Sequence, residues 1–267
     1  MKYEYRKFIR SGDTIEFFEY EREPMVYRGH RRKRKSDSDS EGVGVDRQNT
    51  LQEGQLGKRQ DNARHVAVVF RRIVSSNLNR SELPLLLTLT YKENLTDIAI
   101  GYKDYRSFIQ ALRHKYGKDF RYICVPEFQK RGAVHFHALF WGLPKEVFVQ
   151  EREARGIARL WGKGFVYIKE TDGNERLSSY LAKYMAKAFT DPRLRNKKAY
   201  VASRNVKRPI TGSGFSPIWP VLDDYVGDSK PLLDREYRTK WLGMGRHRVY
   251  KINNNESNDN NRKTETG

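Results

Sequence analysis

The sequence contains a single cysteine, Cys124, and only 6 histidines among its 267 residues. One cysteine excludes an intrachain disulfide and fits a reducing compartment. Sparse cysteine and histidine also make a structural zinc protein the weakest alternative, because a closed zinc site needs four such ligands. No apolar run approaches the roughly 20 residues that span a bilayer, and the N-terminus lacks a signal-peptide pattern. We therefore expect an intracellular, cytoplasmic protein without a membrane partner.

Acidic residues are in the minority, since 33 Asp and Glu face 52 Lys and Arg. The resulting formal net charge of +19 and pI of about 9.9 predict a polyanionic partner, most simply nucleic acid. The 16 tyrosines offer rings that can stack on unpaired bases, and we name Tyr91 and Trp141 as candidates. The helicase phosphate loop, Gly-x-x-x-x-Gly-Lys followed by Ser or Thr, does not occur, so we expect no ATPase in this chain.

Composition along the chain predicts one domain with extensions. Residues 1–60 read as a basic, partly flexible N-terminal extension, whose cluster RGHRRKRK is either a solvated linker, an arm that grips phosphates or a nuclear-localisation signal. The domain covers residues 61–210. Residues 211–252 are interpreted as a C-terminal basic extension packing on the domain, and residues 253–267 as a disordered tail.

Apolar periodicity within the domain predicts an α+β fold, a central and mainly antiparallel sheet with flanking helices, which we expect on one face. Helices are predicted over residues 61–78, 104–116, 144–161 and 174–189, and strands over 85–91, 121–128, 133–141 and 164–169. Outside the domain, residues 14–20 suit an edge strand. Pro126 removes a donor from its strand, so we expect a locally edge-like strand or a bulge there.

A β-hairpin with a polar turn is predicted over residues 121–141. His135 and His137 are two residues apart, so both imidazoles leave one face of the second strand, while the residue between them enters a core. A turn centred on Arg131 places Glu127 opposite His135, with Cβ atoms about 5 Å apart. Two imidazoles and one carboxylate suit a divalent cation that accepts nitrogen and oxygen ligands. A bare His-x-His pair is more often structural, so this interpretation depends on the surrounding motifs.

A second group of candidate residues lies on the helix predicted over residues 174–189. Tyr180 and Tyr184 are four residues apart and share one helix face, and Lys183 and Lys187 repeat that spacing beside them. Taken alone, the spacing also fits packed tyrosines and solvated lysines. The combination and order of motifs separates the two interpretations: Leu-Thr-Leu-Thr, then Glu with His-Phe-His, then Tyr-x-x-Lys-Tyr-x-x-Lys.

This ordered set resembles the HUH endonucleases, specifically the replication initiators of rolling-circle plasmids and small single-stranded DNA phages. The resemblance covers about residues 61–210. It rests on Leu87-Thr88-Leu89-Thr90 as the first motif, His135-Phe136-His137 as the His-hydrophobic-His signature, Glu127 as the third metal ligand, Tyr180 and Tyr184 as the nucleophile pair of the two-tyrosine branch, and Ser203 to Pro209 as a basic downstream segment.

The resemblance implies a ferredoxin- or RRM-like HUH fold and a metal-dependent, site-specific DNA nickase. Its implied site residues are the ligands Glu127, His135 and His137 for Mg²⁺ or Mn²⁺, the nucleophiles Tyr180 and Tyr184, and the assisting cations Lys183 and Lys187. One tyrosine would form a 5′-phosphotyrosine and leave a free 3′-OH, and the strand would later be rejoined. The implied partners are single-stranded or hairpin origin DNA, a host helicase and a host DNA polymerase.

Three alternatives to a replication initiator stay open at this point. The same chemistry serves transposases and mobilisation relaxases, and only the flanking DNA distinguishes these from an initiator. From a different class, the chain would be a non-catalytic nucleic-acid-binding module with the same sheet. Formation of a covalent DNA adduct separates that module from the enzymes.

Overall fold

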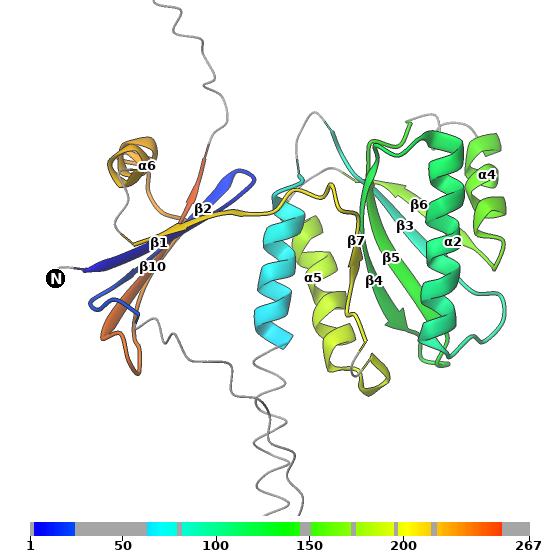
Figure 1. The fold of residues 1–267 in the computed structure, drawn as a ribbon, viewed down its shortest axis with the longest axis horizontal. Helices are drawn as coiled ribbons and strands as arrows, with labels where there is room; N and C mark the ends of the chain where they lie inside the picture. Colours follow the sequence, from blue (N-terminus) through cyan, green and yellow to red (C-terminus); the bar gives the residue numbers. More distant parts are fainter. Residues whose placement is uncertain are drawn as a thin grey trace, which may run out of the picture. The chain divides into compact units, whose positions relative to one another are not determined.

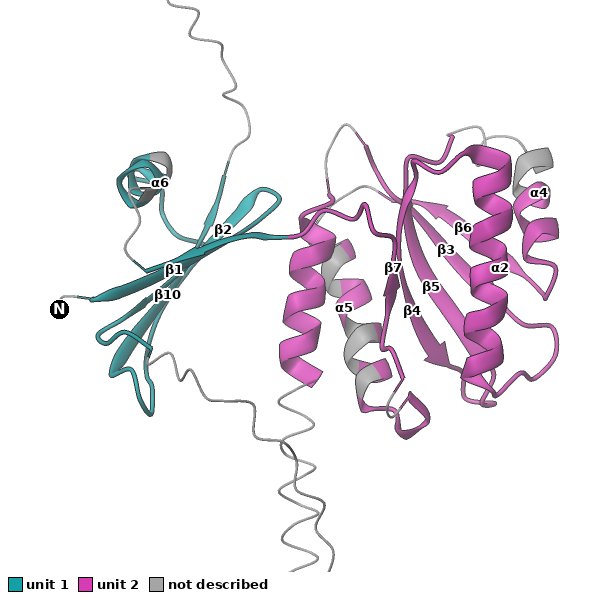
Figure 2. Cartoon of the chain, viewed as in Figure 1, with its two compact units in different colours: residues 1–30, 209–267 teal, residues 31–208 magenta. Residues whose placement is uncertain are grey.

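The structure is a computed structural model, which describes residues 3–24, 63–78, 82–144, 151–171, 175–194, 197–214 and 218–252. Some helix side chains, including that of Lys183, lie outside the described part. The chain divides into two compact units (Figure 2). Unit 1 comprises residues 1–30 and 209–267, and unit 2 comprises residues 31–208.

Unit 2 is built on an antiparallel five-stranded sheet with the strand order β6-β3-β5-β4-β7 (Figure 1). Its strands are β3 (Leu85–Thr90), β4 (Arg121–Phe128), β5 (Val134–Trp141), β6 (Val166–Glu170) and β7 (Val201–Ala202). The alternation in β3 has a direct consequence, because its leucines at 85, 87 and 89 enter the core while Thr88 and Thr90 face the other side. The two threonines thereby mark the functional face of the sheet.

Helices cover both faces of this sheet (Figure 1). On one face, α2 (Ile98–Tyr116) and α4 (Glu151–Trp161) pack over Phe136, whose ring centroid lies 5.2 Å from that of Tyr105. On the other face lie α5 (Glu175–Thr190) and the helix of residues 63–75, followed by the short 3₁₀ helix η1 (Pro192–Leu194). The α+β class is confirmed. The expectation of helices on one face is wrong, because every residue of β5 is buried and both its faces need cover.

Strands β4 and β5 pair in the predicted register. Glu127 lies opposite His135, and Pro126 lies opposite Phe136 with no bulge between the strands. On its other side, β4 pairs with β7 only at Ile123 and Cys124. Within the described residues, Pro126 therefore sits at an edge-like position, where a missing N–H leaves no gap in a ladder.

Helix boundaries differ from the prediction at one position. Helix α2 begins at Ile98, six residues before the predicted start at Asp104, because the Asp97 side chain caps it by accepting a hydrogen bond from Ala99 N at 2.7 Å. Residues 63–75 are helical as predicted, whereas the predicted cap Asp61 and residues 145–150 lie outside the described residues. No helix among the described residues is long and apolar enough to cross a bilayer.

Unit 1 joins the two ends of the chain in a second antiparallel sheet, with the order β8-β1-β2-β10-β9. Its strands are β1 (Tyr5–Ser11), β2 (Thr14–Tyr20), β8 (Ile210–Ser213), β9 (Leu233–Arg238) and β10 (Met244–Lys251), and its helix is α6 (Ile218–Val226). Trp219 of α6 packs on Phe8 and Phe17. Residues 14–20, expected at an edge, form the central strand. Segments predicted as separate extensions thus share a core, because each strand alone exposes one apolar face.

Candidate active site

The functional face of the unit 2 sheet carries two rows of side chains that cross β4, β5, β3 and the segment leading into β6. In the first row, Glu127 of β4 pairs with His135 of β5, which pairs with Thr90 of β3. In the second row, His137 pairs with Thr88. The sequence dictates these rows, since residues two apart on a strand share a face and the hairpin register aligns the strands.

The His137 imidazole is held from both sides. Its Nε2 atom lies 2.8 Å from Glu127 Oε2, and its Nδ1 atom lies 3.3 Å from Thr88 Oγ1. His135 is equally buried, but its Nε2 atom has no hydrogen-bond partner among the described residues. An unpartnered nitrogen in a buried imidazole is costly unless something binds it. This nitrogen is therefore the atom that a ligand would satisfy.

Electrostatics favour neutral imidazoles beside an ionised carboxylate. Burial lowers the pKa of His135 to about 4, and the nearby His137 adds to that shift. Burial also lowers the pKa of His137, although its hydrogen bond to Glu127 offsets part of the effect. Burial raises the pKa of Glu127, but hydrogen bonds from Lys187 and His137 outweigh burial and hold that pKa below its ordinary value. At neutral pH both histidines therefore keep a lone pair for a ligand.

Helix α5 brings the second motif onto this cluster. The ring of Tyr184 stacks on the ring of His137, with centroids 4.3 Å apart and planes inclined by 27°. The Tyr184 hydroxyl donates a hydrogen bond to the Tyr180 hydroxyl at 3.0 Å. One turn further, the Lys187 ammonium forms an ion pair with Glu127. Three residues at i, i+4 and i+7 of one helix thus follow the two rows of the sheet.

The packing of α5 explains this placement. Leu177, Leu181 and Ala188 are buried in the core and fix the helix on the sheet. Tyr180 lies on the neighbouring stripe with 42% of its surface exposed, and burial together with the bond to Tyr184 raises its pKa to about 12. The sequence interpretation had a lysine acting on a phenol. Lys187 contacts Glu127 instead, and the Lys183 side chain lies outside the described residues.

The donor set fits a divalent cation by its chemistry. It offers an ionised carboxylate, two neutral imidazoles and the unpartnered nitrogen of His135. Thr88 can orient His137 in either tautomer, because a hydroxyl both donates and accepts. Among the described residues, however, no three His, Cys, Asp or Glu side chains already stand in a metal-binding arrangement. The contacts of Glu127 with Lys187 and His137 account for this, since they engage both carboxylate oxygens.

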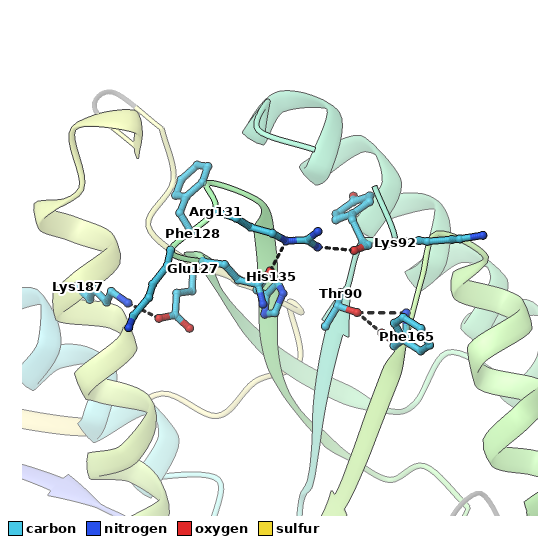
Figure 3. Close-up of a pocket in the computed structure, with 11 residues that line it drawn as sticks. Thr90, Lys92, Glu127, Phe128, Arg131, His135, Phe165 and Lys187 are labelled. Carbon is cyan, nitrogen blue, oxygen red and sulfur yellow. Dashed lines mark hydrogen bonds and ion pairs between the residues drawn. The ribbon is translucent and has the colours of Figure 1, made fainter. Parts of the chain in front are cut away.

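A cleft of about 900 Å³ opens beside the cluster (Figure 3). Basic side chains line it, namely Lys92, Lys130, Arg131 and Lys187, together with the rings of Tyr91, Phe128 and Phe165. Figure 3 shows His135 between Glu127 on one side and Thr90 with Phe165 on the other. Arg131 is anchored here by donating to the backbone oxygen of Tyr91 at 2.9 Å. A cleft with this lining suits a polyanion that also carries planar rings.

Two residues proposed to stack on bases are buried, and that prediction is wrong. Tyr91 packs its ring against Trp161 and bonds to Asp104, while Trp141 is 1% exposed in the core. Sequence reasoning missed Phe165 and Tyr167, which are exposed on the functional face. The available signal was the alternation from 165 to 169, where aromatic and basic residues alternate with valine and isoleucine.

The basic downstream segment has a structural place. Ser203 is buried and exchanges hydrogen bonds with Tyr122 of β4, its N–H donating to Tyr122 O at 2.9 Å and its Oγ accepting from Tyr122 N at 3.1 Å. Lys207 N donates to Asn77 Oδ1 at 3.0 Å, which ties the segment to the end of the helix of residues 63–75. The exposed Arg204 and Arg208 leave their charges in solvent.

Comparison with known families gives one match. The family described as replication-associated protein ORF2/gene 2 protein matches residues 84–189, which run from the start of β3 to the end of α5 and contain both candidate motifs. The match covers less than half of the chain and supports a replication-associated protein of the rolling-circle type. No curated protein and no solved structure matches the chain significantly.

Proposed function

We propose that this protein initiates rolling-circle replication by nicking single-stranded origin DNA through a tyrosine of α5. One observation carries the proposal: Tyr184 stacks on His137, which brings two motifs about 50 residues apart in sequence onto one face of the sheet. The match to a replication-associated family over these same residues supports it. A helix used only for packing has no need to stack a tyrosine pair on a buried histidine and carboxylate.

In the proposed reaction, the Tyr184 or Tyr180 oxygen attacks the scissile phosphorus. The bond from phosphorus to the 3′ oxygen breaks, so the tyrosine holds the 5′ phosphate and the other end becomes a free 3′-OH. The Tyr180 phenol keeps its proton at neutral pH, because its pKa lies near 12. That proton moves to the departing 3′ oxygen as the bond breaks, and the hydroxyl pair offers a route for it. Rejoining is the reverse attack by a 3′-OH.

Glu127, His135 and His137 would hold Mg²⁺ or Mn²⁺ beside the phenols. When bound, the cation supplies polarisation of the scissile phosphate and stabilises its developing charge. Glu127 would exchange its present contacts with Lys187 and His137 for that role, which frees Lys187 to face a phosphate. A free 3′-OH primes a host polymerase, and strand separation falls to a host helicase. With two imidazoles, Mn²⁺ should bind more tightly than Mg²⁺.

The test is covalent capture of DNA on a denaturing gel. Labelled single-stranded oligonucleotides tiled across the replicon are mixed with protein in Mn²⁺ or in chelator. The proposal expects a slow-migrating band that requires the metal and disappears in the double variant Tyr180→Phe and Tyr184→Phe. Tyr167→Phe is the matched control, because it removes an exposed hydroxyl on the same face but off α5, and it should capture DNA like wild type. Robust capture by the double variant would rule out these tyrosines. Tight binding without any adduct would favour a binding module.

A further inference from the structure

The edge strand β6, with the residue that precedes it, exposes two aromatic rings on the functional face. Phe165 is 75% exposed and Tyr167 is 61% exposed, whereas Val166 and Ile168 between and after them pack against the core. Single exposed apolar residues are ordinary on protein surfaces. Two rings at alternating positions of one extended segment form a continuous apolar strip, about 7 Å apart along the strand. We call Phe165 and Tyr167 the β6 ledge.

The β6 ledge continues the two rows of the candidate site. Tyr167 pairs with Thr88, which pairs with His137, and Phe165 is bonded to Thr90, which pairs with His135. The ledge therefore lies two strands from the imidazoles, about 10 Å away on the same face. Thr90 Oγ1 bonds to both the backbone N and O of Phe165 at 3.1 Å, so the segment that presents the first ring is held in place.

Charge indicates what covers the ledge. Residues 63–208 carry 29 Lys and Arg against 13 Asp and Glu, whereas residues 3–24 and 209–252 carry 11 of each. The excess charge of the chain is thus concentrated in the unit that holds the ledge, and Lys92, Lys130 and Arg131 line the adjoining cleft. A second copy would bring the same positive charge to this face. Single-stranded DNA matches both features, since it offers phosphates to the cations and unpaired bases to the rings.

We infer that the β6 ledge stacks the bases that neighbour the scissile phosphate, an inference that rests on the proposed function and specifies how its substrate is held. Bases inside a duplex cannot reach exposed rings at a sheet edge, so the ledge selects unpaired DNA. Base stacking is tolerant of sequence, because every base has a flat face. The ledge thus sets the single-stranded character of the substrate and leaves its sequence to other contacts.

The experiment measures binding without cleavage. Full-length protein carrying Tyr180→Phe and Tyr184→Phe is titrated in chelator against a fluorescein-labelled oligothymidylate of about 12 nucleotides. Fluorescence anisotropy gives Kd for this background and for the same background with Phe165→Ala plus Tyr167→Ala. Trp241→Ala is the matched control, because its side chain is 74% exposed but lies in unit 1. Phe165→Tyr and Tyr167→Phe keep both rings and test whether stacking, rather than the hydroxyl, is what matters. An abasic probe of equal length reports the phosphate contribution.

Each lost ring should weaken oligothymidylate binding by about 5- to 150-fold. Trp241→Ala and the two ring-keeping variants should bind like the background, and the affinity for the abasic probe should not change with the ledge. Equal oligothymidylate affinity with and without the ledge rings would overturn the inference. So would a dimer in sedimentation that dissociates on loss of the rings while the DNA affinity stays the same. Since no cleavage is measured, a failure here is distinct from a failure of the tyrosine chemistry.

Discussion

Gly164 is the point where β3 and the start of β6 come too close for any side chain. A methyl group there would lie 2.5 Å from both Lys92 N and Thr90 O, and 2.8 Å from Tyr91 C. These are backbone atoms, so they cannot move aside as a flexible side chain would. Gly164→Ala must therefore separate the two segments, and with them the Thr90 to Phe165 contact that positions the β6 ledge.

The magnitude follows from what the separation breaks. Gly164 sits between two backbone hydrogen bonds, Thr90 N to Phe165 O and Lys92 N to Lys163 O, each 2.9 Å long. Losing both costs about 2 kcal/mol, and overpacking adds about 1–3 kcal/mol. We expect local destabilisation of about 3 kcal/mol, which is roughly a 150-fold loss of amide protection.

Hydrogen exchange read by mass spectrometry measures this loss in peptides that contain Thr90 and Lys92. The control is Gly117→Ala, because Gly117 has φ +88° but no atom within 4 Å of an added methyl group. It should cost only about 1 kcal/mol for a left-handed backbone, confined to the end of α2. If Gly164→Ala leaves both amides as protected as Gly117→Ala does, the close approach does not constrain the fold as we have reasoned.

Two further predictions use stability as the measurement. Mn²⁺ at 100 times its Kd should stabilise the wild type by about 2.7 kcal/mol in thermal unfolding; His135→Ala should lose that shift, and an equal shift in both proteins would remove His135 from the metal site. In unit 1, hydrogen bonds from Arg6 hold the pKa of Asp223 below its ordinary value. This contribution is present above about pH 4, the pKa range of an unfolded Asp, and is lost as pH falls through the lower folded pKa. Asp223→Asn should therefore lower the urea midpoint at pH 7, by about 1 kcal/mol or less because the carboxylate is half exposed, and equal losses at pH 7 and pH 3 would contradict the pairing.

Local patterns predicted the central hairpin well. The period of two and a four-residue turn are enough to place Glu127 opposite His135 and to send Phe136 into the core. No local pattern reports that α5 lies across that hairpin, because the contact of Tyr184 with His137 is decided by how Leu177 and Leu181 pack. Exposure was equally invisible, so Tyr91 and Trp141 were chosen as surface rings although both are buried.

Unit 1 shows what non-local pairing hides from sequence reasoning. Strand β2 pairs with β10 across more than 200 residues, so nothing near Thr14–Tyr20 announces its central position. The local signals were available but were not used. Gly12 lies at the turn between β1 and β2, and Gly243, with φ +73°, lies at the turn between β9 and β10. Two hairpins at opposite ends of a chain, each with one apolar face, are the pattern that predicts a shared sheet.

The most direct test of the central claim is mass spectrometry of the protein–DNA adduct after nuclease trimming. Trypsin cleaves after Arg176, Lys183 and Lys187, so Tyr180 and Tyr184 fall on separate peptides, residues 177–183 and 184–187. We predict a nucleotide mass on one or both of these peptides, formed only with Mn²⁺ or Mg²⁺ present. A nucleotide on any peptide outside α5, or an adduct that forms equally well in chelator, would contradict a metal-assisted tyrosine nucleophile on this helix.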